Sequence, residues 1–376
     1  MPEWLGPAEG LIRQYGAYGL AVLAALIGLM LGWRVGHRRG HQRQDGEPSQ
    51  LKKRLNEAER KLLAIRESAN SEVLIWTRPR PDDAPLPRRP EEGGKPVVTI
   101  ANLKGGVGKT TVTSNLATML DVQFGKRVLA IDMDYQGSMT SMMALATEKQ
   151  LDRADRNKVI NFIEPGHDVD RLRALPIDLG PVLGRTHLVS AYHPLADVEN
   201  RLLFSWLTHQ NTRDVRFSLA EALARFAEDD TFDICVIDAP PRMTTGFINA
   251  ICASTHLLIP AVMDGLSTEA TVYFAEQVQA LRPDLFPQLE FLGVLPTMVS
   301  RRSGLQPHEE QQKDYLTHQI ENRLAIDCDV LGHCAIPRRV EISRLAGEGL
   351  IYVSGNAEER AIWEPLGKHV VERLHL

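Results

Sequence analysis

Residues 104–111 read Lys-Gly-Gly-Val-Gly-Lys-Thr-Thr, a run typical of a loop that binds phosphate groups. Glycines let backbone N–H groups approach phosphate oxygens where a side chain would obstruct them. Lys109 supplies a cation for the β- and γ-phosphates, and the Thr110 hydroxyl is a ligand for Mg²⁺. The residues expected to bind a nucleoside triphosphate are Gly105, Gly106, Val107, Gly108, Lys109, Thr110 and Thr111. The alternative is a glycine-rich turn that holds no nucleotide.

Two further segments end in carboxylates. The apolar run 128–131 leads into Asp132 and Asp134, and the apolar run 234–237 leads into Asp238. Short apolar runs of this kind are typical of buried strands, so the acids would be presented at strand ends, near the phosphates. For Asp132 or Asp134 the alternative is that the acid only caps a helix or a turn.

The elements around the glycine-rich run have the order needed to position it. The apolar run 97–101 predicts a strand before the loop, and Val112, Leu116 and Leu120, spaced four apart, predict a helix after it. The positive end of that helix would face the phosphates. We therefore expect a doubly wound, mainly parallel α/β sheet with helices on both faces, and the loop at the carboxyl end of its first strand.

The start of the loop departs from the strict phosphate-loop pattern, because Leu103 stands where that pattern has glycine and Lys104 is an additional lysine. This run resembles the deviant Walker A motif of the ParA/MinD ATPases. The resemblance implies that ATP is the nucleotide and that Lys104 contacts the ATP held by the other subunit of a homodimer. A cation supplied in this way stabilises the charge of phosphoryl transfer only once the dimer forms. Hydrolysis would then depend on association.

The same resemblance assigns roles to the acids. It implies that Asp132 lies near Mg²⁺ and Lys109, that Asp134 orients the attacking water, and that Asp238, in a segment similar to a Walker B motif, holds a water bound to Mg²⁺. The expected catalytic residues are therefore Lys104, Lys109 and Asp134, and the expected metal site is made by Thr110, Asp132 and Asp238.

The resemblance covers residues 96–376, which we expect to form the ATPase domain, and is weakest over residues 145–186, a predicted family-variable insert. Further strands are expected at 187–190, 257–260 and 291–298, and a helix at 218–226. Segment 335–339 resembles the closing segment of ParA proteins, which places Pro337 near the nucleotide base. Arg242 is a departure, since the family usually has a small residue there. It is either a salt-bridged surface arginine or a contact to phosphate or a partner.

An uncharged apolar run at residues 16–33 precedes this domain. As a helix its 18 residues would span about 27 Å, close to the thickness of a bilayer's hydrocarbon core. Arginines follow the run, whereas mainly acidic residues precede it, so positive charge predicts that the ATPase lies on the cytoplasmic side. We expect residues 1–15 outside the cytoplasm and residues 16–36 as a single membrane helix in the inner membrane. A cleaved signal peptide is the main alternative.

Between the membrane helix and the ATPase domain we expect two linking segments. Within the basic segment 37–76, a heptad pattern at 51–69 predicts a short coiled coil, with a single amphipathic helix as the alternative. Gly28, Gly32 and Gly36 would let two membrane helices approach closely. Residues 77–95 contain five prolines and are predicted to be a stiff linker.

Charge is divided unequally along the chain. Residues 34–95 carry 15 Lys and Arg against 10 Asp and Glu, whereas residues 96–376 carry 27 against 36. The basic segment favours anionic lipid, and the acidic domain disfavours nonspecific binding to nucleic acid. The four cysteines have no metal-site spacing and suit a reducing cytosol.

These features predict a membrane-anchored ATPase of the ParA/MinD kind that hydrolyses ATP as a nucleotide-dependent dimer to position or regulate an unidentified protein partner. Three other functions are alternatives. A chromosome- or plasmid-partitioning ParA would need a cationic DNA-binding patch, for which Arg338 is one candidate. A non-hydrolysing nucleotide-gated scaffold would not need the acids. A bacterial tyrosine kinase would carry a tyrosine-rich tail, but the last tyrosine is Tyr352.

Overall fold

The computed structural model describes residues 74–164, 169–208, 210, 213–227, 231–300, 304–324, 326–338 and 350–376. The expected outer terminus at 1–15, the membrane helix at 16–36 and the heptad pattern at 51–69 lie outside these residues. Within the described ranges, no helix combines the length and the apolar character needed to cross a bilayer.

The centre of the described chain is one eight-stranded sheet with the strand order β3-β4-β2-β5-β1-β6-β7-β8. Neighbouring strands are parallel except β3 and β4, which are antiparallel. The prediction of a mainly parallel α/β sheet is therefore confirmed. The strands are β1 (Val97–Ile100), β2 (Val128–Asp132), β3 (Ile177–Asp178), β4 (Thr186–Val189), β5 (Ile234–Asp238), β6 (His256–Val262), β7 (Glu290–Val299) and β8 (Ile336–Pro337).

Side chains along the strands alternate between two hydrophobic cores, one on each face of the sheet. In β1, for example, Val97 belongs to one core, whereas Val98 and Ile100 belong to the other. A strand buried on both faces must be apolar at successive positions, and this is why the strands read as continuous apolar runs in the sequence.

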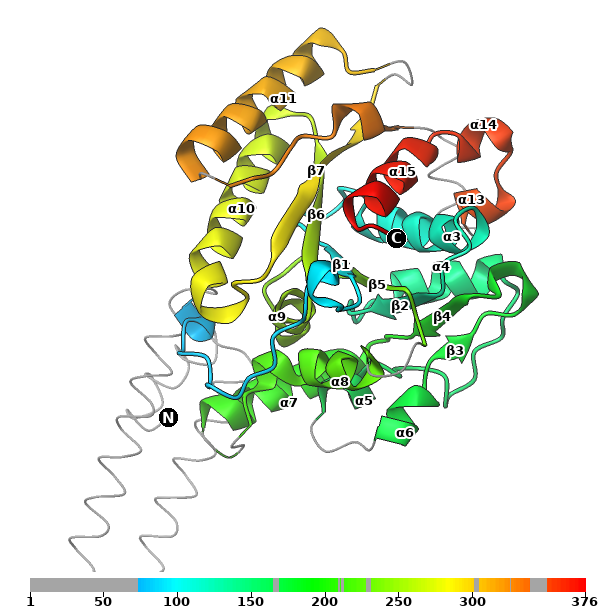
Figure 1. Ribbon diagram of the computed structural model, residues 1–376, viewed down its shortest axis with the longest axis vertical. Helices are drawn as coiled ribbons and strands as arrows, with labels where there is room; N and C mark the ends of the chain where they lie inside the picture. The colour runs from blue at the N-terminus through cyan, green and yellow to red at the C-terminus, as the bar shows by residue number, and fades with distance from the viewer. Residues whose placement is uncertain are drawn as a thin grey trace, which may run out of the picture. The chain divides into compact units, whose positions relative to one another are not determined.

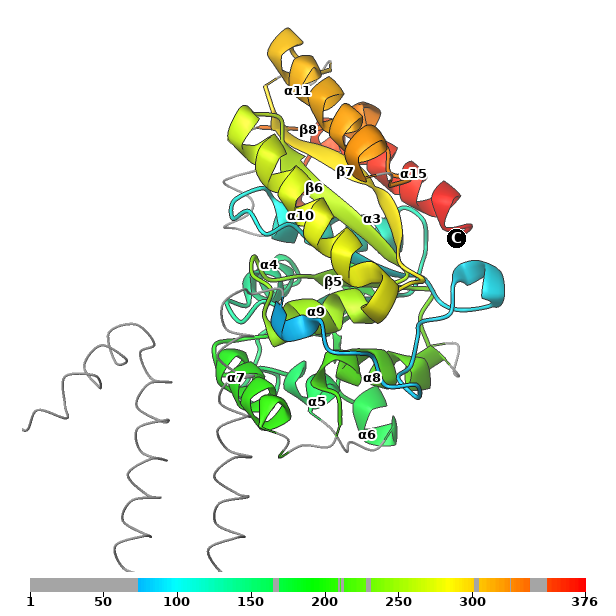
Figure 2. The same ribbon diagram turned by 90° about the vertical axis from the view of Figure 1, so that its left-hand side faces the viewer.

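Helices cover both faces of the sheet (Figure 1). One face packs against α3 (Lys109–Val122), α4 (Ser138–Ala146) and the C-terminal α15 (Glu364–Arg373). The other face packs against α7 (Pro194–Leu207), α8 (Ser218–Ala227), α9 (Thr245–Cys252) and α10 (Gly265–Leu285). Figure 2 shows α11 (Pro307–His318) alongside α10. The remaining helical segments are α5 (Ile160–Ile163), α6 (Val169–Arg173), a π-helix (Gln319–Leu324), α13 (Ile351–Ser354) and α14 (Ala357–Arg360).

Short 3-10 turns complete the chain, and one of them carries an unexpected core residue. Trp76, in the turn Leu74–Trp76, is only 1% exposed and belongs to the same core as α7 and α9. The predicted linker begins at residue 77, directly after this tryptophan. Packing of the domain therefore extends N-terminally beyond residue 96. The other turns are Pro90–Glu92, Pro181–Leu183, Val215–Phe217 and Gly332–Cys334.

Candidate active site

The glycine-rich loop connects β1 to α3 at the carboxyl end of the sheet. Gly106 and Gly108 have φ angles of +75° and +86°, which an L side chain rarely adopts. A Cβ added at Gly105, Gly106 or Gly108 would meet no atom within 4 Å. The backbone conformation thus requires glycine at positions 106 and 108, and the space over the loop is open to a ligand.

The loop is fixed from below by Asn102, which sequence reasoning missed. Its amide nitrogen donates to the carbonyl of Pro260 at 2.9 Å and to Thr271 Oγ1 at 3.1 Å, and its Oδ1 accepts from Lys104 N at 3.0 Å. Asn102 is fully buried. A polar residue directly after an apolar strand and before the glycines was the available signal.

Two buried carboxylates meet beside this loop. Asp132 ends β2 and Asp238 ends β5, and the two residues are direct neighbours in the parallel register of these strands. Thr110 Oγ1 donates to Asp238 Oδ2 at 2.7 Å, and Thr113 Oγ1 donates to its Oδ1 at 3.3 Å. Thr110, Asp132 and Asp238, the three expected metal ligands, therefore lie at adjoining positions.

The electrostatics of this pair favour a bound cation. Burial, and then the charge of Asp238, raise the pKa of Asp132 well above its ordinary value. Burial also raises the pKa of Asp238 to about 7, although the Thr110 hydroxyl opposes the shift. Two adjacent carboxylates without a cation disfavour the doubly ionised state. Carboxylate and hydroxyl oxygens are ligands that Mg²⁺ prefers, so the donor set fits this metal.

Lys109 begins α3 and points back into its own loop. Its Nζ donates to the carbonyl of Lys104 at 3.0 Å, and the residue is 7% exposed. Burial lowers the pKa of Lys109, while the charges of Asp238 and Asp134 act in the opposite direction. Its ammonium group is therefore already held between the loop and the acids.

Lys104 is held elsewhere. Its Nζ donates to Ser267 Oγ at 2.6 Å, and Ser267 Oγ donates to Asp264 Oδ2 at 2.8 Å. Asp264 and Ser267 form the start of α10. The two lysines of the loop thus occupy different surroundings, and only the Lys109 ammonium turns toward the loop's own backbone.

Asp134 lies in the segment between β2 and α4, and is 9% exposed. Its Oδ1 accepts from Gln136 N at 3.0 Å, as in a capped turn. Asp132 also makes local bonds, because its Oδ2 accepts from both the amide and the hydroxyl of Thr140, near the start of α4. Both acids therefore make the capping contacts of the alternative interpretation while standing beside the loop.

Two other residues highlighted by the sequence lie at the same edge of the sheet. Pro337 is buried in β8, where it pairs with Val299 of β7. Residues 339–349 lie outside the described ranges, so the expected position of Pro337 near the nucleotide base stays a prediction. Arg242, in the loop after Asp238, is exposed.

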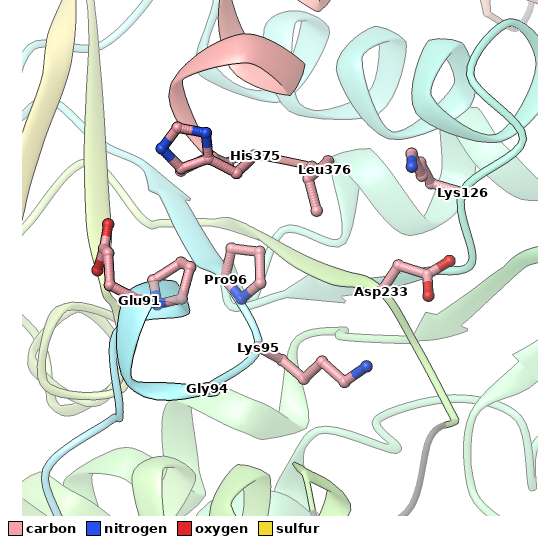
Figure 3. Close-up of a pocket in the computed structure, with 10 residues that line it drawn as sticks. Glu91, Gly94, Lys95, Pro96, Lys126, Asp233, His375 and Leu376 are labelled. Carbon is pink, nitrogen blue, oxygen red and sulfur yellow. The ribbon is translucent and has the colours of Figure 1, made fainter.

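A hollow of about 360 Å³ lies at the opposite edge of the sheet (Figure 3). Pro96 and Asp233, which precede β1 and β5, help to line it, so it opens at the amino ends of the strands. The glycine-rich loop and Asp238 follow the same two strands. The hollow is therefore separate from the phosphate-binding edge. The four cysteines are buried and free, and the described residues contain no cluster of metal-ligating side chains of the kind formed by three or more His, Cys, Asp or Glu.

Comparison with known proteins agrees with this geometry. The AAA domain family model (AAA_31) matches residues 95–291. The chain is 30% identical over 215 residues to the chromosome-partitioning ATPase Soj of Thermus thermophilus, covering 57% of this chain and 74% of that protein. It is 29% identical over 257 residues to the sporulation initiation inhibitor protein Soj of Bacillus subtilis, covering 67% and 88%.

Solved structures share the fold. The ATP complex of Cyanothece McdA superposes with a TM-score of 0.58 at 20% identity, covering 73% of this chain and 96% of that one. A putative plasmid partition protein of Borrelia burgdorferi bound to AMPPNP superposes with a TM-score of 0.55 at 22% identity, covering 74% and 99%. At this level of identity, the superpositions establish the fold alone.

Proposed function

Because the chain belongs to the ParA and Soj family of AAA domain ATPases and is an ATPase, we propose that it hydrolyses ATP with Mg²⁺ as a nucleotide-dependent dimer, anchored in the membrane, to position or regulate a partner protein. The observation that carries the hydrolytic part is the neighbouring pair Asp132 and Asp238 with the Thr110 hydroxyl 2.7 Å from Asp238.

Each residue of the site has a role in this proposal. Backbone N–H groups of residues 105–110 bind the phosphates, and an ATP phosphate competes with the Lys104 carbonyl for the Lys109 ammonium. Thr110, Asp132 and Asp238 would hold Mg²⁺, which when bound would offset negative charge on the phosphates. Asp134, partly committed to the turn at Gln136, has a second carboxylate oxygen with which to orient the attacking water.

The surroundings of Lys104 support the dimer. Its ammonium is tethered through Ser267 to Asp264 at the start of α10, whereas the Lys109 ammonium is held within the loop. Leu266, beside Ser267, is 77% exposed and offers apolar surface next to the tethered lysine. A second subunit meeting this surface would cover Leu266 and receive Lys104 at its own nucleotide.

The membrane part of the proposal is supported by the uncharged run at 16–33 and the arginines that follow it. We expect inner-membrane localisation with the ATPase on the cytoplasmic side. Full-length protein should stay with membranes through alkaline carbonate extraction and should hydrolyse ATP in detergent, with the activity removed by EDTA and restored by Mg²⁺. Recovery of the intact chain in the soluble fraction would contradict the anchor. Metal-independent turnover would contradict the assigned site.

Chromosome partitioning is the second candidate, and the names of several relatives favour it. In that function, ATP-bound protein would bind duplex DNA without sequence preference. The acidic balance of residues 96–376 works against it. A gel-shift assay with ATP, at more than one salt concentration, separates the two functions, since a positioning ATPase without DNA binding should shift nothing.

A further inference from the structure

The segment before the ATPase domain is clamped by one buried arginine. Arg216 is 0% exposed, and its guanidinium donates to the carbonyls of Trp76 at 2.8 Å, Arg78 at 2.6 Å and Pro79 at 3.0 Å. Its remaining donors bond both carboxylate oxygens of Asp214. All five N–H donors of the guanidinium are therefore satisfied, three of them by residues 76–79, which we call the strap.

Trp76 is the strap residue that reaches the active-site side of the domain. Its indole stacks on Trp206 of α7 with ring centroids 6.1 Å apart. Its Nε1 donates to the carbonyl of Met243 at 3.1 Å. Figure 1 and Figure 2 both show the turn Leu74–Trp76 close to α9, which Met243 precedes by two residues.

Met243 belongs to the loop 239–244, which connects Asp238 to α9. The far end of this loop is fixed by Glu199, whose carboxylate accepts from Thr244 Oγ1 at 2.9 Å and from Gly246 N. The near end joins the acids directly, because Met133 N donates to the carbonyl of Asp238 at 3.0 Å. The strap thus contacts the loop that follows the metal-ligand candidate Asp238, at the residue before Thr244.

We propose that Trp76 is a positioning residue for the loop 239–244, through which the segment preceding the domain sets the rate of ATP turnover without setting ATP affinity. The rate effect rests on the proposed hydrolysis at Asp238. The indole of Trp76 bonds the loop after Asp238, and the Lys109 ammonium is held by the carbonyl of Lys104, so we expect the strap to affect turnover and not ATP affinity. The described chain begins at Leu74, and the hydrogen bond from Trp76 to the Met243 carbonyl joins this segment to the loop.

The strap is a fixed part of the site. Its departure would leave three hydrogen bonds of a buried guanidinium unmade, and burying an unsatisfied charged donor is strongly unfavourable. The strap therefore stays docked while the loop responds to it, unlike a lid that opens and closes.

The test is Trp76→Phe in the full-length protein. Phenylalanine keeps a ring to pack on Trp206 but removes the donor to the Met243 carbonyl. We expect kcat to fall about tenfold, because the loss of roughly one hydrogen bond raises the activation free energy by an amount that corresponds to this factor. KM for ATP should be unchanged. Hydrogen–deuterium exchange at the amides of Thr244 and Phe247, which close the turn into α9, should accelerate.

Arg89→Ala is the matched control, because it loosens the other end of the segment that joins the strap to β1. Arg89 Nη1 lies 3.1 Å from Glu290 Oε1 on β7, far from Met243 in the chain. This variant should keep wild-type kcat, KM and loop exchange. Equal loss of kcat in both variants would overturn the inference, since loosening alone would then suffice.

The exchange measurement separates this inference from the proposed function. Wild-type exchange at Thr244 and Phe247 in Trp76→Phe overturns the positioning role whether or not ATP is hydrolysed. Accelerated exchange in a protein that does not hydrolyse ATP supports the coupling of strap and loop and overturns only hydrolysis. A rise in KM with unchanged kcat also overturns the inference.

Discussion

Asp132 and Asp238 face each other as register partners at the carboxyl ends of β2 and β5. The two residues are 106 positions apart in the chain, and they meet because β2 and β5 are parallel neighbours whose carboxyl ends share one edge of the sheet. The Thr110 hydroxyl bonds one member of the pair, and Thr140 bonds the other. Most of the site's chemistry follows from this single adjacency.

Asp134→Ala and Lys109→Ala should have different consequences. We expect Asp134→Ala to bind ATP and to lose turnover by about 100-fold or more, because water orientation is removed while the phosphate loop is intact. Lys109→Ala should weaken ATP binding itself. Binding of a fluorescent ATP analogue and phosphate release, measured on the same preparations, check both expectations. Normal turnover in Asp134→Ala would show that another group orients the water.

Lys104→Ala should reduce turnover by more than it reduces ATP affinity. The expected reason is that Lys104 acts on the partner's nucleotide, which matters only in the dimer. Light scattering on residues 74–376 should show dimers with a non-hydrolysable ATP analogue and monomers with ADP. Ser267→Ala, which removes the Lys104 tether but leaves its charge, is the matched control. A constant mass with every nucleotide would contradict trans action.

Glu199→Gln should change how stability depends on pH. Burial raises the pKa of Glu199 to about 7 from an ordinary value of 4.5, against the opposing bonds from Thr244 and Gly246. Since the folded state then binds the proton more tightly than the unfolded state, the wild type loses stability as pH rises from about 4.5 to 7. The loss contributed by this group is up to about 3 kcal/mol.

Urea unfolding at pH 5 and pH 7.5 measures this effect. Glutamine keeps an oxygen for both donors but carries no charge, so the fall in the free energy of unfolding should be smaller in the variant by about 1–3 kcal/mol. An equal fall in the free energy of unfolding in the two proteins would assign the titration to another group.

Fragments beginning at residue 74 and at residue 96 should differ in stability. The shorter fragment lacks Trp76, a fully buried side chain, and leaves three Arg216 donors without their carbonyl partners. We expect it to be less stable by at least about 3 kcal/mol. Thermal unfolding of the two fragments checks this, and equal melting temperatures would show that the strap adds nothing to the fold.

The sequence predicted the sheet well because each central strand is buried on both faces and must be continuously apolar. The predicted runs at 128–131 and 234–237 are β2 and β5, extended by one aspartate each. The runs at 257–260 and 291–298 lie within β6 and β7, and the helix at 218–226 is α8. The pattern of apolar residues within each segment indicates its secondary structure, so these predictions do not depend on contacts between distant segments.

The parts that sequence reasoning missed depend on contacts between distant segments. Asn102 and Ser267 have ordinary local surroundings, and their importance follows only from partners more than 150 residues away. Trp76 stands next to a proline-rich stretch and gives no periodic signal. It is buried because its ring stacks on Trp206 of α7 and its carbonyl accepts from Arg216, and no local sequence pattern indicates these contacts.

The clamp between Arg216 and the strap also decides where this protein can be divided and recombined. If the N-terminal segment were exchanged with that of a relative by joining at residue 96, Arg216 would lose its three carbonyl partners in the strap. Trp206 would also lose the stacked ring of Trp76. A junction before Leu74 keeps the strap and Arg216 from the same protein. Chimeras made at these two points should therefore differ in stability, although they differ by only some twenty residues, because only the junction before Leu74 keeps the strap with Arg216.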